Sequence, residues 1–350
     1  MLFYILFALS ISCLLLLDFS FRQKSNFFQI VAVILVIFIS GLREYVGPDF
    51  DDYVRLYQDK THEDEIEFGF EMVMKLLQSF NLNYNFLFLL FSLLTCLFVY
   101  FGIKKHTLNV NIAFLIFLLI PGLYLNSFSI VRQSFSIAVS FYAFHYLLSK
   151  NYYKYLLIMA VGFSIHYSCL IAMVIHLIVF KFPNIFNKRN IFIFLLISLV
   201  FTQIDLFNLL ASIFENLKYA KYFLGESIKV SIVKILVLNT MAFLILINYE
   251  KIKNRFPNQK YFMMLYFFSV IFTNIFSSFI FLTRVTYYFR IFEIIVVADL
   301  IYLWSKKYRV LLILFFIIYY FGMFVLAIDT EIKAENDDTK LVPYKNVLFI

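Results

Sequence analysis

The stretch that decides the fold is residues 83–103, NYNFLFLLFSLLTCLFVYFGI, which carries no charged side chain. A helix needs about 20 apolar residues to cross the hydrocarbon core of a bilayer, and this run is long enough. Similar apolar runs recur from one end of the chain to the other. None of them shows the alternation that is typical of transmembrane barrel strands. The sequence therefore predicts an all-α polytopic membrane protein.

The composition agrees with a membrane protein and excludes several other classes. Hydrophobic residues make up 63% of the chain and charged residues 15%, whereas soluble proteins average about 45–50% and about 25%. The net charge of +8 comes from bases in short turns between apolar runs, as the positive-inside rule predicts for cytoplasmic loops. This distribution argues against a nucleic-acid partner. The three cysteines stand singly in apolar runs, which predicts core residues instead of metal ligands or redox groups.

We expect about ten transmembrane helices in one integral membrane domain over residues 1–327, with the first apolar run kept as a helix. The expected spans are residues 2–17, 27–42, 83–103, 110–126, 132–148, 191–205, 230–248, 261–280, 287–304 and 310–327. The basic turns between them contain Arg22, Lys24, Lys104, Lys105, Lys150, Lys154, Lys181, Lys188, Arg189, Lys251, Lys253, Arg255, Lys306, Lys307 and Arg309. With these turns in the cytoplasm, the loop 43–82, the stretch 206–229 and the tail 328–350 face outward.

One apolar segment does not fit a simple up-and-down arrangement. Residues 155–180 form a single run between two basic turns that should lie on the same side of the membrane. A single crossing would place the basic turns that follow on the outer side. A re-entrant or broken helical hairpin, with its tip near Ser164, His166 and Ser168, returns the chain to the cytoplasmic side instead. Non-helical backbone at that depth is tolerated only where it is buried in protein or lines a wet cavity. The tip is therefore a candidate site, and a single crossing of 155–180 is the alternative.

The outward loop 43–82 begins with the charged segment REYVGPDFDDY, residues 43–53. Charged groups are costly inside a bilayer but not at its edge, so this segment is either part of a functional site or a solvated loop. Asp49, Asp51 and Asp52 could hold a divalent cation, although three close acids in a loop are commonly only solvated. The second half, from Phe68 to Phe80, has the amphipathic pattern of a helix lying at the membrane interface.

Two further polar groups lie in or beside apolar runs. Arg132 and Gln133 stand at the outward end of a span, where the planar fork of arginine suits bidentate contact with phosphate or carboxylate. The alternative is an arginine that only reaches toward the lipid headgroups. His166 lies well inside its apolar run beside serines. Histidine is a residue type suited to proton transfer, while a packing role is the alternative.

Arg284 and Arg290 lie on either side of Tyr287 at the outward start of another span. Their spacing of six residues does not place them on one helical face, so one arginine could face a site while the other meets headgroups. Together the outward arginines predict a cationic pocket beside an acidic loop. Such a pocket suits a substrate with a pyrophosphate at one end and hydroxyl groups at the other. The sequence contains no nucleotide-binding loop, no hydrolase motif and no metal-ligand spacing, so we expect no cofactor and no metal.

These residues occur in an ordered series of short motifs. The series contains R-x3-G-x-D-x3-Y (Arg43, Gly47, Asp49, Tyr53), E-x-G-F (Glu67, Gly69, Phe70), RQ (Arg132, Gln133), F-x-x-H-Y-S (Phe163, His166, Tyr167, Ser168), and later Arg284 and Tyr287. In this order they resemble the EpsG family, a Wzy-like group of polysaccharide polymerases that extend O-antigen, capsule or exopolysaccharide chains. The resemblance covers about residues 1–325. Pro48 departs from it, since family members often have a small polar residue there, and the tail after residue 328 carries no matching motif.

The resemblance implies a metal-independent, GT-C-like glycosyltransferase in the bacterial cytoplasmic membrane. Its substrates would be oligosaccharide repeat units on undecaprenyl diphosphate, presented among membrane lipids at the outer face, with a chain-length regulator and a flippase as implied partners. Arg132 and Arg284 would bind the diphosphate, and Asp49 or His166 would act as base. Arg43 and Glu67 would support the binding of substrate, together with Gln133, Tyr287 and Arg290.

Two other classes of membrane protein stay open on the sequence. A transporter or flippase would use the same arginines to bind an anionic substrate without making a bond. An O-antigen ligase or a membrane acyltransferase is the other alternative. Transporters often have two inverted halves with paired broken helices. Only one apolar run in this chain looks broken, which counts mildly against a transporter.

Overall fold

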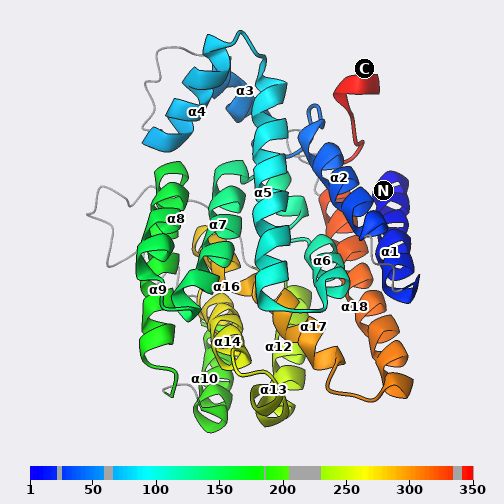
Figure 1. Cartoon of the computed structure of the whole chain (residues 1–350), viewed down its shortest axis with the longest axis vertical. Helices are drawn as coiled ribbons and strands as arrows, with labels where there is room; N and C mark the ends of the chain where they lie inside the picture. Colours follow the sequence, from blue (N-terminus) through cyan, green and yellow to red (C-terminus); the bar gives the residue numbers. More distant parts are fainter. Residues whose placement is uncertain (22–25, 59–65, 185–186, 205–229, 334–340, 350) are drawn as a thin grey trace. The chain divides into compact units, whose positions relative to one another are not determined.

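The computed structural model describes residues 1–21, 26–58, 66–184, 187–204, 230–333 and 341–349. Over these ranges the chain forms helices and no strand, which confirms the predicted all-α fold (Figure 1). Two elements of the predicted topology, the basic turn with Arg22 and Lys24 and the stretch 206–229, lie outside the described residues.

The helices form two compact units. Unit 1 contains residues Met1–Met173 and Trp304–Ile350, and unit 2 contains Val174–Leu303. The prediction of one integral domain over 1–327 stays a prediction.

Unit 1 is built around α5 (Tyr84–His106), which packs against α2 (Phe27–Gly41) on one side and α7 (Val131–Leu148) on the other (Figure 1). The next helix, α8 (Tyr152–Ile165), packs on α7. The remaining elements of the unit are α1 (Leu2–Phe21), α3 (Phe50–Gln58), α4 (Phe68–Ser79), α6 (Val110–Leu119), the short 3-10 helix η1 (Leu125–Phe128), α18 (Lys306–Lys333) and η4 (Val347–Phe349).

In unit 2, α14 (Gln259–Ile275) is the central helix. It packs against α10 (Lys188–Phe201), α12 (Ile232–Ile247), α16 (Tyr287–Arg290) and α17 (Glu293–Ile301). The unit also contains α13 (Tyr249–Arg255) and α15 (Ile280–Val285). The helix α9 (Cys169–Lys181) runs across the boundary between the two units.

Each predicted span coincides with a helix, but two of them are interrupted. The span 110–126 ends as α6 at Leu119, because Pro121 disfavours helical backbone in the residue before it. The span 287–304 is split between α16 and α17. Among the described helices, α5 and α18 are long and apolar enough to cross a membrane, and the bent pair α12–α13, with its 61° kink, would make a third. The count of about ten spans and the GT-C-like arrangement therefore stay predictions.

The run 155–180 folds as two helices joined by a short turn. α8 ends at Ile165 and α9 begins at Cys169. The second helix turns back along the first, since the Tyr155 hydroxyl donates to the Met173 carbonyl at 3.4 Å and the Cys169 thiol lies 3.9 Å from the Met159 carbonyl. At 1.5 Å per residue α8 is only about 21 Å long, shorter than the hydrocarbon core. A helical hairpin with its tip at 166–168 is therefore present, and its place in the bilayer stays a prediction.

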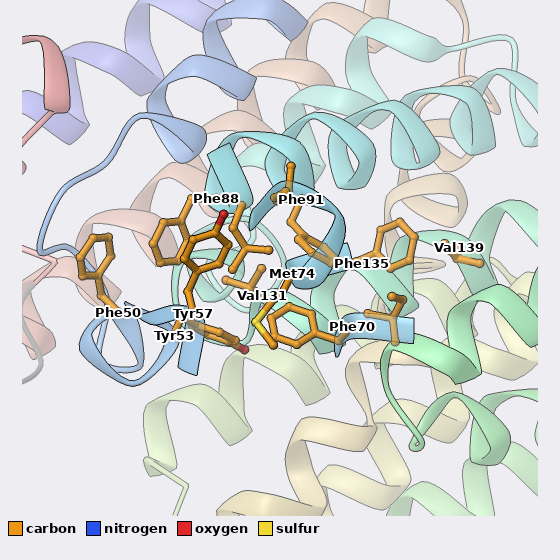
Figure 2. Packing of buried hydrophobic residues seen from close by; sticks show 13 residues of the cluster. Phe50, Tyr53, Tyr57, Phe70, Met74, Phe88, Phe91, Val131, Phe135 and Val139 are labelled. Atoms are coloured by element: carbon orange, nitrogen blue, oxygen red, sulfur yellow. The ribbon is translucent and has the colours of Figure 1, made fainter. Parts of the chain in front are cut away.

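The loop 43–82 folds onto the bundle through α3 and α4, which lie at the end of unit 1 where α5 begins (Figure 1). Their apolar faces join α5 and α7 in one hydrophobic core, in which the Phe50 ring stacks on Phe88 with centroids 4.6 Å apart. Figure 2 shows this cluster, which contains Phe50, Tyr53, Tyr57, Phe70, Met74, Leu77, Leu87, Phe88, Phe91, Val131, Phe135, Val139 and Ile165. The core fixes the start of α4 beside the start of α7.

α4 also touches the hairpin tip, and a glycine makes the close approach possible. A Cβ added to Gly69 would lie 2.8 Å from the Ser164 carbonyl oxygen and equally close to the Ser164 Cβ. Contacts this short are essentially never seen between real side chains, so any larger residue would force α4 away from α8.

We predict that Gly69→Ala destabilises the protein by about 1–3 kcal/mol, the usual range for overpacking a tight contact. The matched control is Gly322→Ala in α18, where an added Cβ meets nothing within 4 Å. That substitution should be neutral or stabilise by about 0.5–1 kcal/mol, because alanine favours a helix over glycine. Thermal unfolding of the two detergent-purified variants measures the difference. Equal unfolding temperatures would show that the contact between Gly69 and Ser164 is not tight.

Candidate functional site

The buried carboxylate of Glu67 binds two other predicted site residues, Arg132 and His166. Glu67 lies directly before α4 and is only 6% exposed. Its Oε2 accepts a hydrogen bond from Arg132 Nη1 at the start of α7, and its Oε1 lies 2.7 Å from His166 Nδ1 at the hairpin tip. The cluster of Glu67, Arg132 and His166 therefore connects three segments that are distant in the sequence.

Two aromatic rings hold the Arg132 side chain in place. Its guanidinium carbon lies 5.3 Å from the centre of the Phe70 ring and 5.8 Å from that of Tyr53, within the range of cation–π attraction. The Arg132 backbone N–H also donates to the Tyr53 hydroxyl at 3.5 Å. Arg132 is the second residue of α7, so its positive charge adds to the positive end of the helix dipole. The surroundings of Arg132 therefore favour anions.

His166 ends α8 in an extended conformation, with φ −156° and ψ 117°. Its backbone N–H donates to the Gly162 carbonyl at 3.0 Å, which closes the last turn of the helix. The extended backbone takes the side chain out of the helical path, and the imidazole reaches the Glu67 carboxylate. About a quarter of the His166 side chain stays exposed. The turn at the hairpin tip thus presents a ring that solvent or a ligand can reach.

The electrostatics of the cluster keep Glu67 charged. Burial by itself raises the pKa of the Glu67 carboxyl, but the hydrogen bond from His166 and the charge of Arg132 outweigh it. The net effect lowers this pKa below its usual value of 4.5. At neutral pH Glu67 is therefore a carboxylate that accepts hydrogen bonds from both partners.

Asp49, the other predicted base, is half-buried in the residue before α3. Burial raises the pKa of the Tyr53 hydroxyl, Arg132 lowers it, and the nearby Asp49 charge raises it further. Asp49 therefore lies close enough to act on the ring that contacts Arg132. Its neighbours Asp51 and Asp52 are exposed on α3, where Asp52 pairs with Arg55.

Arg43 lies in a different environment from Arg132. It is 2% exposed, and its guanidinium donates to the backbone carbonyls of Ser40, of Val46 at 3.1 Å and of Phe128 at 2.9 Å. The Phe88 ring lies 4.5 Å from its guanidinium carbon. Burial lowers the pKa of Arg43 to about 10, which still leaves it charged at neutral pH. These contacts give Arg43 a structural role that was not expected from the sequence, and direct contact with substrate stays only a prediction.

Comparison with known proteins assigns the chain to a family. The EpsG family matches residues 26–346, nearly the whole chain. The chain belongs to the EpsG family. No curated protein and no solved structure matches it. Membership indicates a membrane protein of the polysaccharide-polymerase type.

The family match extends into the C-terminal tail, which the motifs in the sequence did not reach. In this EpsG-family protein the tail binds the turn that carries Arg43. Arg43 and Asn346 form an isolated antiparallel bridge, with hydrogen bonds from the Glu44 N–H to the Lys345 carbonyl at 3.1 Å and from the Val347 N–H to the Leu42 carbonyl at 2.9 Å. The tail therefore helps to hold the Arg43 turn in place.

Tyr344 anchors the same tail segment. Its ring stacks on Phe3 with centroids 4.1 Å apart, and its hydroxyl donates to the Ile39 carbonyl at 2.9 Å. Tyr4 also donates to the Leu341 carbonyl at 2.8 Å. The start of α1, the end of α2 and the tail thus lie at one end of unit 1. The side of the membrane that this end faces stays a prediction.

The remaining predicted site residues lie in unit 2, apart from Gln133, which is buried in α7. Tyr287 is 6% exposed and accepts a hydrogen bond from Lys234 Nζ at 3.3 Å. Arg290 is buried against Glu293, with its Nε 3.2 Å from the carboxylate, across the break between α16 and α17. Arg284 is half-buried at the end of α15. Within unit 1, Glu67, Arg132 and His166 of the predicted site bind one another.

Sequence reasoning missed Lys234 as a candidate site residue. It is the third residue of α12, and its ammonium lies 5.7 Å from the centre of the Tyr287 ring. The available signal was a lysine near the start of α12 that is the only charged residue of this helix. The aromatic support of Arg132 by Phe70 was also missed, although Phe70 belongs to the E-x-G-F motif.

We predict that Glu67→Gln destabilises the protein by about 1–3 kcal/mol at neutral pH, because it leaves Arg132 without its carboxylate partner. The lowered pKa of Glu67 means that its contribution is complete above about pH 4.5 and is lost as the pH falls through the lower, folded-state value. Wild type and variant should therefore differ at neutral pH and converge in acid, as measured by thermal unfolding. Glu71→Gln, which breaks the surface pair of α4 with Lys75, is the control and should cost at most about 1 kcal/mol. A constant gap at all pH values would contradict the ionised state of Glu67.

We predict that Tyr344→Phe destabilises the protein by about 0.5–1.5 kcal/mol, because the substitution removes two hydrogen bonds but keeps the stack on Phe3. Tyr344→Ala should cost more, since it also removes the ring. Tyr308→Phe, at an exposed tyrosine of α18, is the matched control and should change little. Thermal unfolding and protease cleavage of the tail measure both effects. A tail that is cleaved equally fast in all three variants would show that Tyr344 does not anchor it.

Proposed function

We propose that the protein is a polysaccharide polymerase of the outer face of the bacterial cytoplasmic membrane. It would join oligosaccharide repeat units carried on undecaprenyl diphosphate during the synthesis of O-antigen, capsule or exopolysaccharide. Membership of the EpsG family supports the class of protein. The observation that carries the proposal is the bridge from Glu67 to both Arg132 and His166, because it places an anion-binding group beside a proton acceptor.

In this proposal Arg132 binds the diphosphate of the growing chain. As the bond between the anomeric carbon and the diphosphate oxygen breaks, negative charge develops on the leaving group. A guanidinium at the start of a helix stabilises such charge, and its position is already fixed by Glu67, Phe70 and Tyr53. The fixed position means that little reorganisation is needed during the reaction.

His166 takes the proton of the acceptor hydroxyl. When Nδ1–H donates to Glu67, the other ring nitrogen, Nε2, is the proton acceptor. The acceptor oxygen then attacks the anomeric carbon, a new glycosidic bond forms, and undecaprenyl diphosphate leaves with the electron pair. Glu67 orients the ring and stabilises the imidazolium, so we assign it a positioning role instead of contact with substrate.

Asp49 is the alternative base, because its charge acts on the Tyr53 hydroxyl, which accepts a hydrogen bond from the Arg132 N–H. Arg284 and Tyr287 remain candidates for a second contact with substrate on the strength of their sequence motif. The proposal that they share a substrate site with Arg132 rests on the family resemblance and not on geometry, because they belong to unit 2 and Arg132 to unit 1. A chain-length regulator and a flippase remain the partners that the family resemblance implies.

We predict that a strain without this protein accumulates single lipid-linked repeat units and loses long chains, as gel profiles and extracted lipid-linked glycans would show. Undiminished chain length in that strain would rule out the polymerase. A transporter would give a different profile, because unflipped units would accumulate on the cytoplasmic side.

We predict that Arg132→Ala does not restore long chains to the deletion strain, although the protein reaches normal abundance in the membrane. Arg132→Lys should restore little, because a lysine lacks the planar fork, and His166→Gln should lower the rate by about 10²-fold or more. Arg55→Ala removes an arginine whose side chain is 77% exposed on α3, and it should behave as wild type. Full activity of Arg132→Ala would move the diphosphate role elsewhere.

A further inference from the structure

We propose that α4 lies in the boundary between headgroups and acyl chains of the membrane, with one of its faces in direct contact with lipid. That face is a stripe of four large apolar residues at intervals of four: Phe68, Met72 and Leu76 in the helix, and Phe80 directly after it. Their exposed fractions are 70%, 57%, 56% and 68%. A run of exposed apolar side chains of this length on one helix indicates a contact surface.

The other two faces of α4 have different partners. Phe70, Met74 and Leu77 are buried in the core of unit 1. The polar edge carries the ion pair between Glu71 and Lys75, whose lysine is 62% exposed. At about 100° per residue, the stripe lies between the buried face and this polar edge. A helix with one face on protein, one apolar and one charged fits the plane of a membrane interface.

The surface next to the stripe supports lipid as the occupant. α4 packs directly on α8, and α8 exposes the apolar side chains of Leu156, Leu157, Val161 and Phe163. In a membrane protein of this composition, such residues on a bundle helix face lipid. The stripe therefore continues a lipid-facing surface outward, while Glu71 and Lys75 mark the side that faces water.

The placement of α4 has a consequence for the substrate, and this step rests on the proposed function. Glu67 directly precedes Phe68, so the depth of α4 in the membrane sets the depth of the carboxylate that holds Arg132 and His166. The cluster then lies at the level of lipid headgroups. A diphosphate attached to a membrane-embedded polyprenyl chain can meet Arg132 there without leaving the bilayer.

The test uses tryptophan fluorescence, because Trp304 is the only tryptophan of the chain. In a Trp304→Phe background, a tryptophan is introduced either by Leu76→Trp on the stripe or by Lys75→Trp on the polar edge. Each full-length variant is reconstituted in phosphatidylethanolamine and phosphatidylglycerol vesicles, with acyl chains brominated near the headgroup. Aqueous iodide is the second quencher. Thermal unfolding confirms that both variants are folded like their parent.

We predict that brominated lipid removes most of the fluorescence of the Leu76→Trp variant and that iodide removes little of it. The Lys75→Trp variant should show the reverse. Strong quenching of both variants by iodide would place the stripe in water and overturn the proposal. Protection of the Leu76→Trp variant from both quenchers would mean that protein covers the stripe, such as a second copy of the chain, and would overturn it as well. The vesicle assay contains no glycan substrate, so its result is independent of the chain-length assay that tests the polymerase.

Discussion

The site depends on one buried carboxylate. A charged group that is taken out of water needs a partner, so Glu67 at 6% exposure is stable only because Arg132 and His166 both bind it. The requirement works in both directions. Arg132 lies in the first turn of α7, where a positive charge is unfavourable unless an anion lies nearby, and Glu67 supplies that anion. Structure and proposed chemistry therefore rest on the same contacts.

Arg43 and Arg132 show how the groups that an arginine binds determine its role. Arg43 donates to three backbone carbonyls and is closed off from solvent, whereas Arg132 binds a carboxylate and keeps about a quarter of its side chain exposed. Arg43 binds the backbone of the segment that leads into α7. One of its acceptors is the carbonyl of Phe128, which lies four residues before Arg132, and the tail fixes the same turn from the other side.

The sequence predicted the helices well, because an uncharged apolar run has few alternatives to a helix in a membrane. The pattern of basic turns predicted a break in the run 155–180 near Ser164, His166 and Ser168, and the turn is found at residues 166–168. A re-entrant position in the bilayer stays a prediction. The contacts of Glu67 could not be derived in this way, since they join residues 65 and 99 positions apart. Only the resemblance to a family predicted that Glu67, Arg132 and His166 belong to the same site. The burial of Arg43 was not predictable either, because its acceptors are backbone carbonyls, which a sequence pattern does not show.

The glycine of the E-x-G-F motif explains how the long-range contact is reached. Glu67 lies two residues before Gly69, and His166 lies two residues after Ser164, so the approach of Gly69 to Ser164 sets how near the two side chains can come. With any larger residue at position 69, α4 would have to move away from α8, and the 2.7 Å contact of Glu67 with His166 would lengthen. Phe70 then turns inward beneath Arg132. The motif therefore describes one physical unit: a carboxylate, the close approach that delivers it, and the ring that supports its partner.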